Sequence, residues 1–184
     1  MSTHVEPLVT VADLEAMPDD GNRYETIEGE LFLSKAPSVI NQRVFGRLFK
    51  EFALYLDVNP IGELLATPGL TFTDVDAVIP DIVLTLNERI SQVVTGDRLT
   101  AAPDLVVEIL SPGPSNLRRD RVAKRQLYGR FGVGEYWILD PQERTVEVYI
   151  LLGDTLMLSA TLTESDQLTS VLLPGFRCEV KSLF

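Results

Sequence analysis

Residues 102–141, APDLVVEILSPGPSNLRRDRVAKRQLYGRFGVGEYWILDP, determine the fold that the sequence predicts. The apolar run 105–110 ends at a Ser-Pro-Gly-Pro turn, a basic segment follows, and a second apolar run begins at residue 136 after a Gly-Val-Gly break. Short apolar runs bounded by glycine and proline are typical of buried β-strands. The basic segment carries apolar residues at helical spacing, so the stretch predicts a strand, a helix and a second strand.

The segments nearest the N-terminus predict two helices and a hairpin. Thr10 is a typical N-cap for a short helix. Residues 24–34 form two short strand-like runs around a Glu-Gly pair, which indicates a β-hairpin. Residues 37–57 carry apolar side chains at helical spacing and predict a long helix with one face toward a core.

Two strands are predicted between this helix and the opening stretch. Residues 63–73 are strand-like, with a Pro-Gly pair that indicates a bend, a bulge or an edge position. Residues 78–86, VIPDIVLTL, predict a nearly continuous strand covered on both faces, in which Asp81 is the single charge. Residues 87–100 then form a polar connection that contains a short helix near its start.

The segments after the opening stretch complete the predicted fold. Residues 145–152 and 155–162 indicate a hairpin around a Gly-Asp turn, and the C-terminal tail adds a short strand. Together with the earlier elements, this order predicts an α/β sandwich in which helices pack on a mixed β-sheet. A chain of 184 residues without an internal repeat or a long linker fits a single domain, residues 1–184.

Composition excludes several classes of protein. With one cysteine, Cys178, and one histidine, His4, the chain forms neither an internal disulfide nor a zinc site of the Cys/His type. No apolar run approaches the roughly 18 residues of a membrane-spanning helix. The N-terminus also lacks the basic and apolar regions of a secretory signal. A cytoplasmic protein with no membrane segment is therefore expected.

Charge is distributed unevenly along the chain. The net charge is -11, which argues against nonspecific nucleic-acid binding by the whole surface. Residues 118–130 hold six of the 16 basic residues and one acid, so this segment carries +5 and the rest of the chain -16. The segment is either a solvated helix face or a local surface that binds phosphate groups, and the sequence leaves both readings open.

Two acids, Asp81 and Glu108, lie in runs of otherwise apolar residues. An unpaired ionised carboxylate there costs several kcal/mol, so each needs an arginine, backbone donors or a divalent cation. If the two strands are neighbours, both carboxylates can converge and, with a main-chain carbonyl and waters, suit Mg²⁺ or Mn²⁺. The alternative is that Asp81 caps a turn after Pro80 while Glu108 pairs with an arginine.

The helix of the opening stretch carries a lysine on its apolar side. On a helix that begins near residue 115, one broad face contains positions 117, 120, 124, 127, 128 and 131. Lys124 therefore points toward the sheet, while Arg118, Arg119 and Arg125 point outward. The ammonium group either reaches the two carboxylates and a bound phosphate or extends to solvent at the sheet edge. Tyr128, one turn later, either adds a hydroxyl to the same site or packs in the core.

Several motifs in this order resemble one nuclease family. They are Pro80-Asp81, residues 103–112 (PDLVVEILSP), Lys124 with Tyr128, residues 132–137 (GVGEYW), and the hairpin residues 24–31 (YETIEGEL). Together they resemble the Uma-type family of restriction endonucleases, which belongs to the PD-(D/E)XK nuclease superfamily. The resemblance covers roughly residues 11–149.

The resemblance implies a restriction endonuclease-like fold and Mg²⁺-dependent cleavage of phosphodiester bonds in DNA, with Mn²⁺ as the alternative ion. Asp81 matches the family's first acidic position and Glu108 the second. The superfamily's lysine usually stands two residues after the second acid, where this chain has Leu110, and Lys124 matches the substitute lysine on the next helix. Asn41 stands where the first long helix often carries a histidine.

The first functional hypothesis is a metal-dependent endonuclease. Asp81, Glu108 and the Ile109 carbonyl bind the ion, and Lys124 orients a water or stabilises charge that develops on the phosphoryl group. The residues expected to contact DNA are Arg118, Arg119, Arg125, Tyr128 and Asn41. A homodimer built on the terminal hairpins is a further expectation.

The second hypothesis is a catalytically weakened or inactive binding module on the same scaffold. The acidic surface, Asn41 and the leucine at position 110 favour it. A hydrolase of another class is disfavoured, because the sequence contains neither a G-x-S-x-G elbow nor a phosphate-cradling glycine loop.

Overall fold

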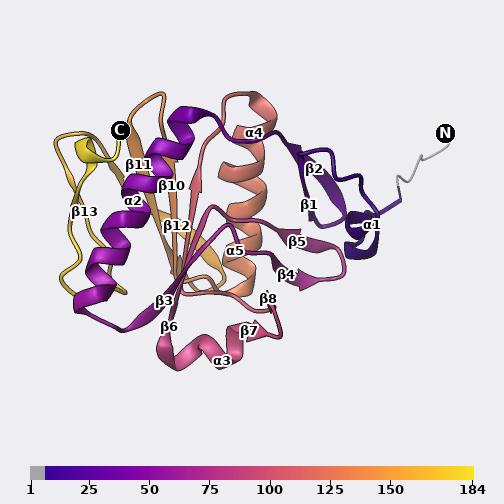
Figure 1. Ribbon diagram of the computed structural model, residues 1–184, viewed down its shortest axis with the longest axis horizontal. Helices are drawn as coiled ribbons and strands as arrows, with labels where there is room; N and C mark the ends of the chain where they lie inside the picture. The colour runs from indigo at the N-terminus through magenta and orange to yellow at the C-terminus, as the bar shows by residue number, and fades with distance from the viewer. Residues whose placement is uncertain (1–6) are drawn as a thin grey trace.

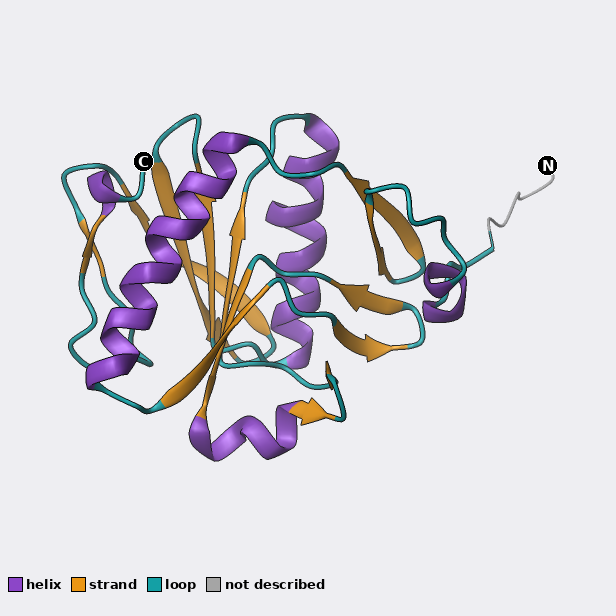
Figure 2. Cartoon of the chain, viewed as in Figure 1, coloured by secondary structure: helices purple, strands orange, loops and turns teal. Residues whose placement is uncertain are grey.

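The computed structural model describes residues 7–184 and contains a six-stranded sheet. The sheet is twisted and has helices on both faces (Figures 1 and 2). The strand order is β12-β11-β10-β9-β6-β3. These strands span Thr155–Leu162, Thr145–Leu152, Glu135–Asp140, Leu105–Ile109, Ile82–Leu86 and Gly62–Ala66. β9 and β10 are parallel and the other neighbouring pairs are antiparallel. The mixed sheet predicted from the sequence is confirmed. The single histidine, His4, lies outside the described residues.

Helix α2 (Val39–Val58) covers one face of this sheet, as the spacing of residues 37–57 predicts. It begins at the N-cap Ser38, and it buries Val44, Leu48 and Phe52 at intervals of four residues. Those side chains pack against odd-numbered positions of β9 and β10, among them Trp137. Successive strand residues point to opposite faces, so even-numbered positions of the same strands face the other way.

The second face of the sheet is covered by the helix that joins β9 to β10. This helix runs as α4 (Pro114–Arg118), a π-helical segment η2 (Arg119–Lys124) and α5 (Arg125–Phe131). Its buried residues Leu127 and Tyr128 pack against even-numbered strand positions such as Val106 and Ile138. It ends at Gly132, whose φ of 91° is left-handed and favours glycine.

A second sheet lies beside the first one, on the side of α4 and α5 (Figure 1). Its strand order is β2-β1-β5-β4-β8-β7. These strands span Glu30–Ser34, Arg23–Ile27, Asp76–Val78, Leu70–Thr73, Arg98–Leu99 and Val94–Thr95. The predicted hairpin is β1–β2, and its central residues Glu28 and Gly29 both have positive φ, at 51° and 77°, as a type I′ turn requires.

The remaining short elements also agree with the sequence predictions. Helix α1 (Val11–Glu15) starts with a capping box between Thr10 and Asp13. The connection after β6 contains η1 (Asn87–Arg89) and α3 (Ile90–Val93). β11 and β12 form the predicted hairpin.

Two predicted strands are wrong as single elements, because each divides between the two sheets. Residues 63–73 separate into β3 and β4 around Pro68, next to Thr67 with a φ of 48°. Residues 78–86 separate into β5 and β6, with Pro80 in the break. Proline lacks the N–H that a central strand needs, so the ladder stops there. Asp81 therefore lies in a link between two sheets, not inside a continuous strand.

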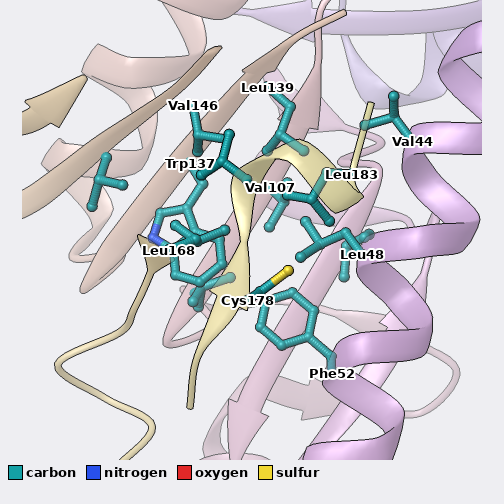
Figure 3. Packing of buried hydrophobic residues seen from close by; sticks show 14 of the residues in the cluster. Val44, Leu48, Phe52, Val107, Trp137, Leu139, Val146, Leu168, Cys178 and Leu183 are labelled. Carbon is teal, nitrogen blue, oxygen red and sulfur yellow. The ribbon is translucent and has the colours of Figure 1, made fainter. Parts of the chain in front are cut away.

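The C-terminal segment closes the core on the side of α2. β13 (Gln167–Leu168) pairs with β14 (Cys178–Glu179), and η3 (Val180–Ser182) follows. Figure 3 shows Leu168, Cys178 and Leu183 packed among side chains of α2 and the central strands. No helix within residues 7–184 combines the length and the apolar character that crossing a membrane requires.

We predict that Gly129→Ala lowers the free energy of unfolding by about 1–2 kcal/mol. A Cβ on Gly129 in α5 would lie 2.9 Å from the Asp154 carbonyl oxygen in the β11–β12 turn, and backbone on both sides must shift. Such overpacking costs about 1–3 kcal/mol, which exceeds the roughly 0.5–1 kcal/mol that alanine gains in a helix.

The matched control is Gly46→Ala in α2, where a Cβ meets no described atom within 4 Å. This variant should be more stable than wild type by about 0.5–1 kcal/mol. Urea unfolding measures both variants, and equal effects of the two substitutions would contradict the close packing of α5 on the hairpin.

Candidate active site

Three carboxyl groups and one ammonium group meet at one pocket, and all but one of the carboxyl groups are buried. The pocket lies between the N-terminal end of α2, hairpin β1–β2 and η2. Glu25 comes from β1, Asp81 from the link before β6, Glu108 from β9 and Lys124 from η2. The pocket has a volume of about 40 Å³ and is open to solvent. This volume suits a few water molecules or a small hydrated ion, not an organic cofactor.

Sheet register brings the two predicted acids together. β6 and β9 are antiparallel neighbours with Ile82 opposite Val107, so Asp81 and Glu108 lie across from each other at one end of the pair. The Oδ2 of Asp81 accepts a hydrogen bond from the Ile109 N–H at 2.8 Å. The condition under which the two carboxyl groups can converge, that their strands are neighbours, is therefore met.

Asp81 and Glu108 have different surroundings. The Asp81 side chain is 20% exposed, and its Oδ1 lies 3.6 Å from a terminal nitrogen of Arg23. Glu108 is buried, and its Oε1 accepts hydrogen bonds from Lys124 Nζ at 2.8 Å and from the Tyr128 hydroxyl at 3.0 Å. The alternative in which an arginine neutralises Glu108 is therefore wrong, whereas Asp81 has both a backbone donor and a nearby guanidinium.

Lys124 is the central cation of the site and is only 1% exposed. Its Nζ lies 2.7 Å from Glu25 Oε1 and 2.8 Å from Glu108 Oε1. The prediction that Lys124 points toward the sheet is confirmed, and the alternative in which it extends to solvent is wrong. Tyr128 contributes its hydroxyl to the same cluster and also packs its ring against Tyr136.

The π-helical segment accounts for a wrong prediction about Arg119. In a π-helix the repeating hydrogen bond joins residues five apart, so Arg119 and Lys124 share one face. Arg119 is consequently buried, where a regular α-helix would have directed it outward. Its guanidinium makes two hydrogen bonds to Asp120 and lies 3.7 Å from Glu25 Oε2. The Asp120 carbonyl accepts a hydrogen bond from the Tyr136 hydroxyl.

The other arginines of this helix are engaged by the chain's own groups. Arg118 is exposed as predicted, but it makes two hydrogen bonds to Glu30. Arg121 pairs with Asp140 and Glu147. Arg125 stacks over the Tyr149 ring at 5.3 Å. Much of the positive charge that the sequence suggested for phosphate binding is thus compensated within the fold.

Asn41 holds the end of β9 in place. It is buried at the first turn of α2, and its Nδ2 donates to the carbonyls of Ile109 at 3.3 Å and Leu110 at 3.0 Å. Ser38 donates in turn to the Asn41 side-chain oxygen. The Ile109 carbonyl therefore faces the α2 side of the pocket, and the role expected for Asn41 in contacting DNA stays a prediction.

Burial and neighbouring charges shift the pKa values of these groups. Burial raises the pKa of Glu108 to about 8, although the Lys124 ammonium acts in the opposite direction. Burial likewise raises the pKa of Asp81, against the hydrogen bond from Ile109. Burial also acts to raise the pKa of Glu25, but Lys124 and Arg119 outweigh it, so the pKa is lowered. Opposed displacements of neighbouring carboxyl groups are typical of functional sites.

Glu25 is the member of this cluster that we did not predict from the sequence. The available signal was the two-residue period of the hairpin, because Glu25 shares a strand face with Ile27 and pairs with Phe32, both buried. A charged residue on an otherwise apolar strand face needs a partner, and Lys124 is that partner.

The oxygen atoms of the pocket fit a hydrated divalent cation. Within residues 7–184, no group of three or more His, Cys, Asp or Glu side chains is arranged to hold a metal ion. Asp81, Glu108 and the Ile109 carbonyl nevertheless supply hard oxygen donors at one solvent-open pocket. Mg²⁺ is usually held by one or two carboxylates and keeps several waters, so this smaller donor set suits it.

The mixed sheet, its β9-helix-β10 unit and the pocket at the end of β6 and β9 define a restriction endonuclease-like protein. The Uma2 family model, described as "Putative restriction endonuclease", matches residues 11–181. The chain therefore belongs to the Uma2 family.

A solved structure shows the same fold. It is the crystal structure of a "putative nuclease belonging to DUF820" from Anabaena variabilis ATCC 29413 at 1.96 Å resolution. The two chains superpose with a TM-score of 0.76 at 19% identity, over 96% of this chain and 97% of the other. A comparison with curated proteins finds no match.

We predict that the stability of the metal-free protein falls as pH rises from about 5 to about 8. The folded state keeps the proton of Glu108 up to a pKa of about 8, whereas the unfolded chain releases it near the ordinary value of 4.5. The folded state therefore binds more protons in this window, and Glu108 lowers the free energy of unfolding by up to about 1.4 kcal/mol per pH unit.

Glu108→Gln mimics the protonated carboxyl group and should flatten this pH dependence. Urea unfolding in EDTA at about pH 6 and about pH 7.5 measures the change in the free energy of unfolding between the two pH values. The exposed substitution Glu63→Gln serves as the control. Identical pH slopes for wild type and Glu108→Gln would contradict the elevated pKa of Glu108.

Proposed function

We propose that this protein is a metal-dependent endonuclease that hydrolyses phosphodiester bonds in DNA. The observation that carries the proposal is the meeting of Asp81, Glu108 and Lys124 at one small solvent-open pocket. Hydrolysis of a phosphodiester increases the negative charge on the phosphoryl oxygens during attack. Two carboxyl groups that can bind a cation and an ammonium group can stabilise that charge. Membership in a family described as a restriction endonuclease supports the same reaction class.

Asp81, Glu108 and the Ile109 carbonyl are the proposed ligands of Mg²⁺ or Mn²⁺. Such an ion, when bound, stabilises negative charge on phosphoryl oxygens and lowers the pKa of a coordinated water. Asp81 is the more accessible carboxylate and is the first that an ion entering from solvent would meet. Ile109 donates its N–H to Asp81, so this residue is held beside the first of the proposed ligands.

Lys124 acts on Glu108 and on the substrate, and Tyr128 acts through Glu108. The pKa of Lys124 is raised, because its attraction to Glu108 and Glu25 outweighs the effect of burial, so the group stays an ammonium at neutral pH. We propose that this ammonium orients the attacking water or donates to a phosphoryl oxygen. Burial also raises the pKa of Tyr128, so its hydroxyl remains a donor that orients Glu108.

The DNA backbone is the proposed partner of the pocket mouth. Arg23 and Lys35 line the pocket and supply positive charge at its opening. The predicted contacts of Arg118 and Arg125 remain part of the proposal, and Arg118 would exchange Glu30 for a phosphate. Arg119 and Asn41 line the pocket, so their predicted contacts with DNA remain part of the proposal, whereas the buried Tyr128 hydroxyl is bonded to Glu108 and acts through that group.

The proposal predicts Mg²⁺-dependent cleavage of a supercoiled plasmid by wild type, with losses of at least about 100-fold in Asp81→Asn, Glu108→Gln and Lys124→Met. The exposed substitutions Glu63→Gln and Lys50→Met serve as controls and should retain activity. Circular dichroism confirms that each variant is folded. Equal residual activity in wild type and all of these variants would remove the assignment.

A catalytically weakened or inactive binding module is the second candidate. The observation that favours it is the elevated pKa of Glu108, which binds Lys124 and Tyr128 through the same oxygen. Calorimetry with Mn²⁺ at a pH of about 8, where Glu108 can ionise, discriminates the candidates. Binding that Asp81→Asn abolishes supports the nuclease, and no binding by wild type supports the module.

We propose that residues 1–184 act as one domain in the cytoplasm. The homodimer suggested by the terminal hairpins stays a prediction, which sedimentation velocity would test.

A further inference from the structure

We propose that Glu25 is a positioning residue for the reaction: it holds the Lys124 ammonium and the Asp81-bearing link in place when Glu108 is engaged by a cation. This role rests on the proposed function. The roles proposed for the other residues of the pocket do not account for the buried carboxylate of hairpin β1–β2, and this role does.

The carboxylate of Glu25 contacts three groups of the site, two on η2 and one in the link between β5 and β6. Its Oε1 lies 2.7 Å from Lys124 Nζ and accepts the Ile79 N–H, also at 2.7 Å. Its Oε2 lies 3.7 Å from Arg119. Glu25 is 2% exposed, so these contacts form in a region of low dielectric, where charge–charge interactions are strong.

The contact with Lys124 matters most when Glu108 becomes a ligand. In the structure, one ammonium group is shared between Glu25 and Glu108 at nearly equal distances. A dication on Glu108 would weaken that carboxylate's hold on Lys124 and would repel the ammonium directly. Asp120 lies 4.0 Å away and is already bound by Arg119. Glu25 is then the carboxylate that keeps Lys124 at the pocket.

The contact with Ile79 links the same carboxylate to Asp81. Ile79 and Asp81 belong to the break between β5 and β6, where proline interrupts the strand ladder. The hydrogen bond from the Ile79 N–H fixes this break two residues before Asp81. Glu25 therefore fixes both sides of the pocket, and its own position is set by the pairing of β1 with β2 and β5.

The test compares Glu25→Gln with Glu135→Gln in the cleavage assay. The amide introduced by Glu25→Gln keeps the size of the side chain and an oxygen for the Ile79 N–H, but it lacks the charge that holds Lys124. Glu135 is also fully buried, and it accepts hydrogen bonds from Trp137, Ser170 and Val171 away from the pocket. Both substitutions remove a buried carboxylate, so a loss of general stability affects both.

We expect Glu25→Gln to lower kcat by at least about 10-fold while KM for DNA and the Kd for Mn²⁺ change by less than about threefold. Glu135→Gln should leave kcat within about twofold of wild type at a temperature where both variants are folded. In a Lys124→Met background, Glu25→Gln should add no further loss, because the group it positions is gone.

Two outcomes would overturn the positioning role and leave the proposed function intact. The first is an active wild type with an unchanged kcat in Glu25→Gln. The second is a further loss in the double variant equal to that in the single variant, since Glu25 would then act independently of Lys124. No cleavage by wild type would overturn the proposed function and this role together.

Discussion

The ammonium group of Lys124 is shared between two buried carboxyl groups, those of Glu25 and Glu108, in the interior of this protein. Removing an ion from water costs several kcal/mol, and only close, hydrogen-bonded partners offset that cost. Lys124 meets this condition with Glu25 and Glu108 within 2.8 Å, and Tyr128 adds a neutral donor. Through these contacts the connecting helix is tied both to β1 of one sheet and to β9 of the other.

The π-helical segment makes this arrangement possible. It places Arg119 and Lys124 on the same side of the helix, so that two cations face the acids of β1 and β9. Neither cation would suffice alone, because Arg119 is committed to Asp120 and Lys124 is shared. π-Helical turns are rare and frequently occur at functional sites, which agrees with the position of this one beside the pocket.

The sequence predicts elements best where one local rule governs them. The long helix, the two hairpins and the parallel β9-helix-β10 unit follow from apolar spacing and turn residues. Prediction fails where tertiary pairing decides. Residues 78–86 resemble one strand because their apolar character is continuous, yet proline and the second sheet divide them. Regular α-helical spacing directs Arg119 outward, and no local signal announces a π-turn. Glu25 escapes prediction because its partner, Lys124, lies in a distant part of the chain.

The most direct test of this account is the crystal structure of the protein soaked in Mn²⁺, with anomalous data collected at the manganese edge. The account predicts one anomalous peak between the Asp81 and Glu108 carboxylates, beside the Ile109 carbonyl, with Lys124 still in contact with Glu25. Peaks only at other sites, with Asp81 still beside Arg23 and Glu108 still bound by Lys124, would contradict it.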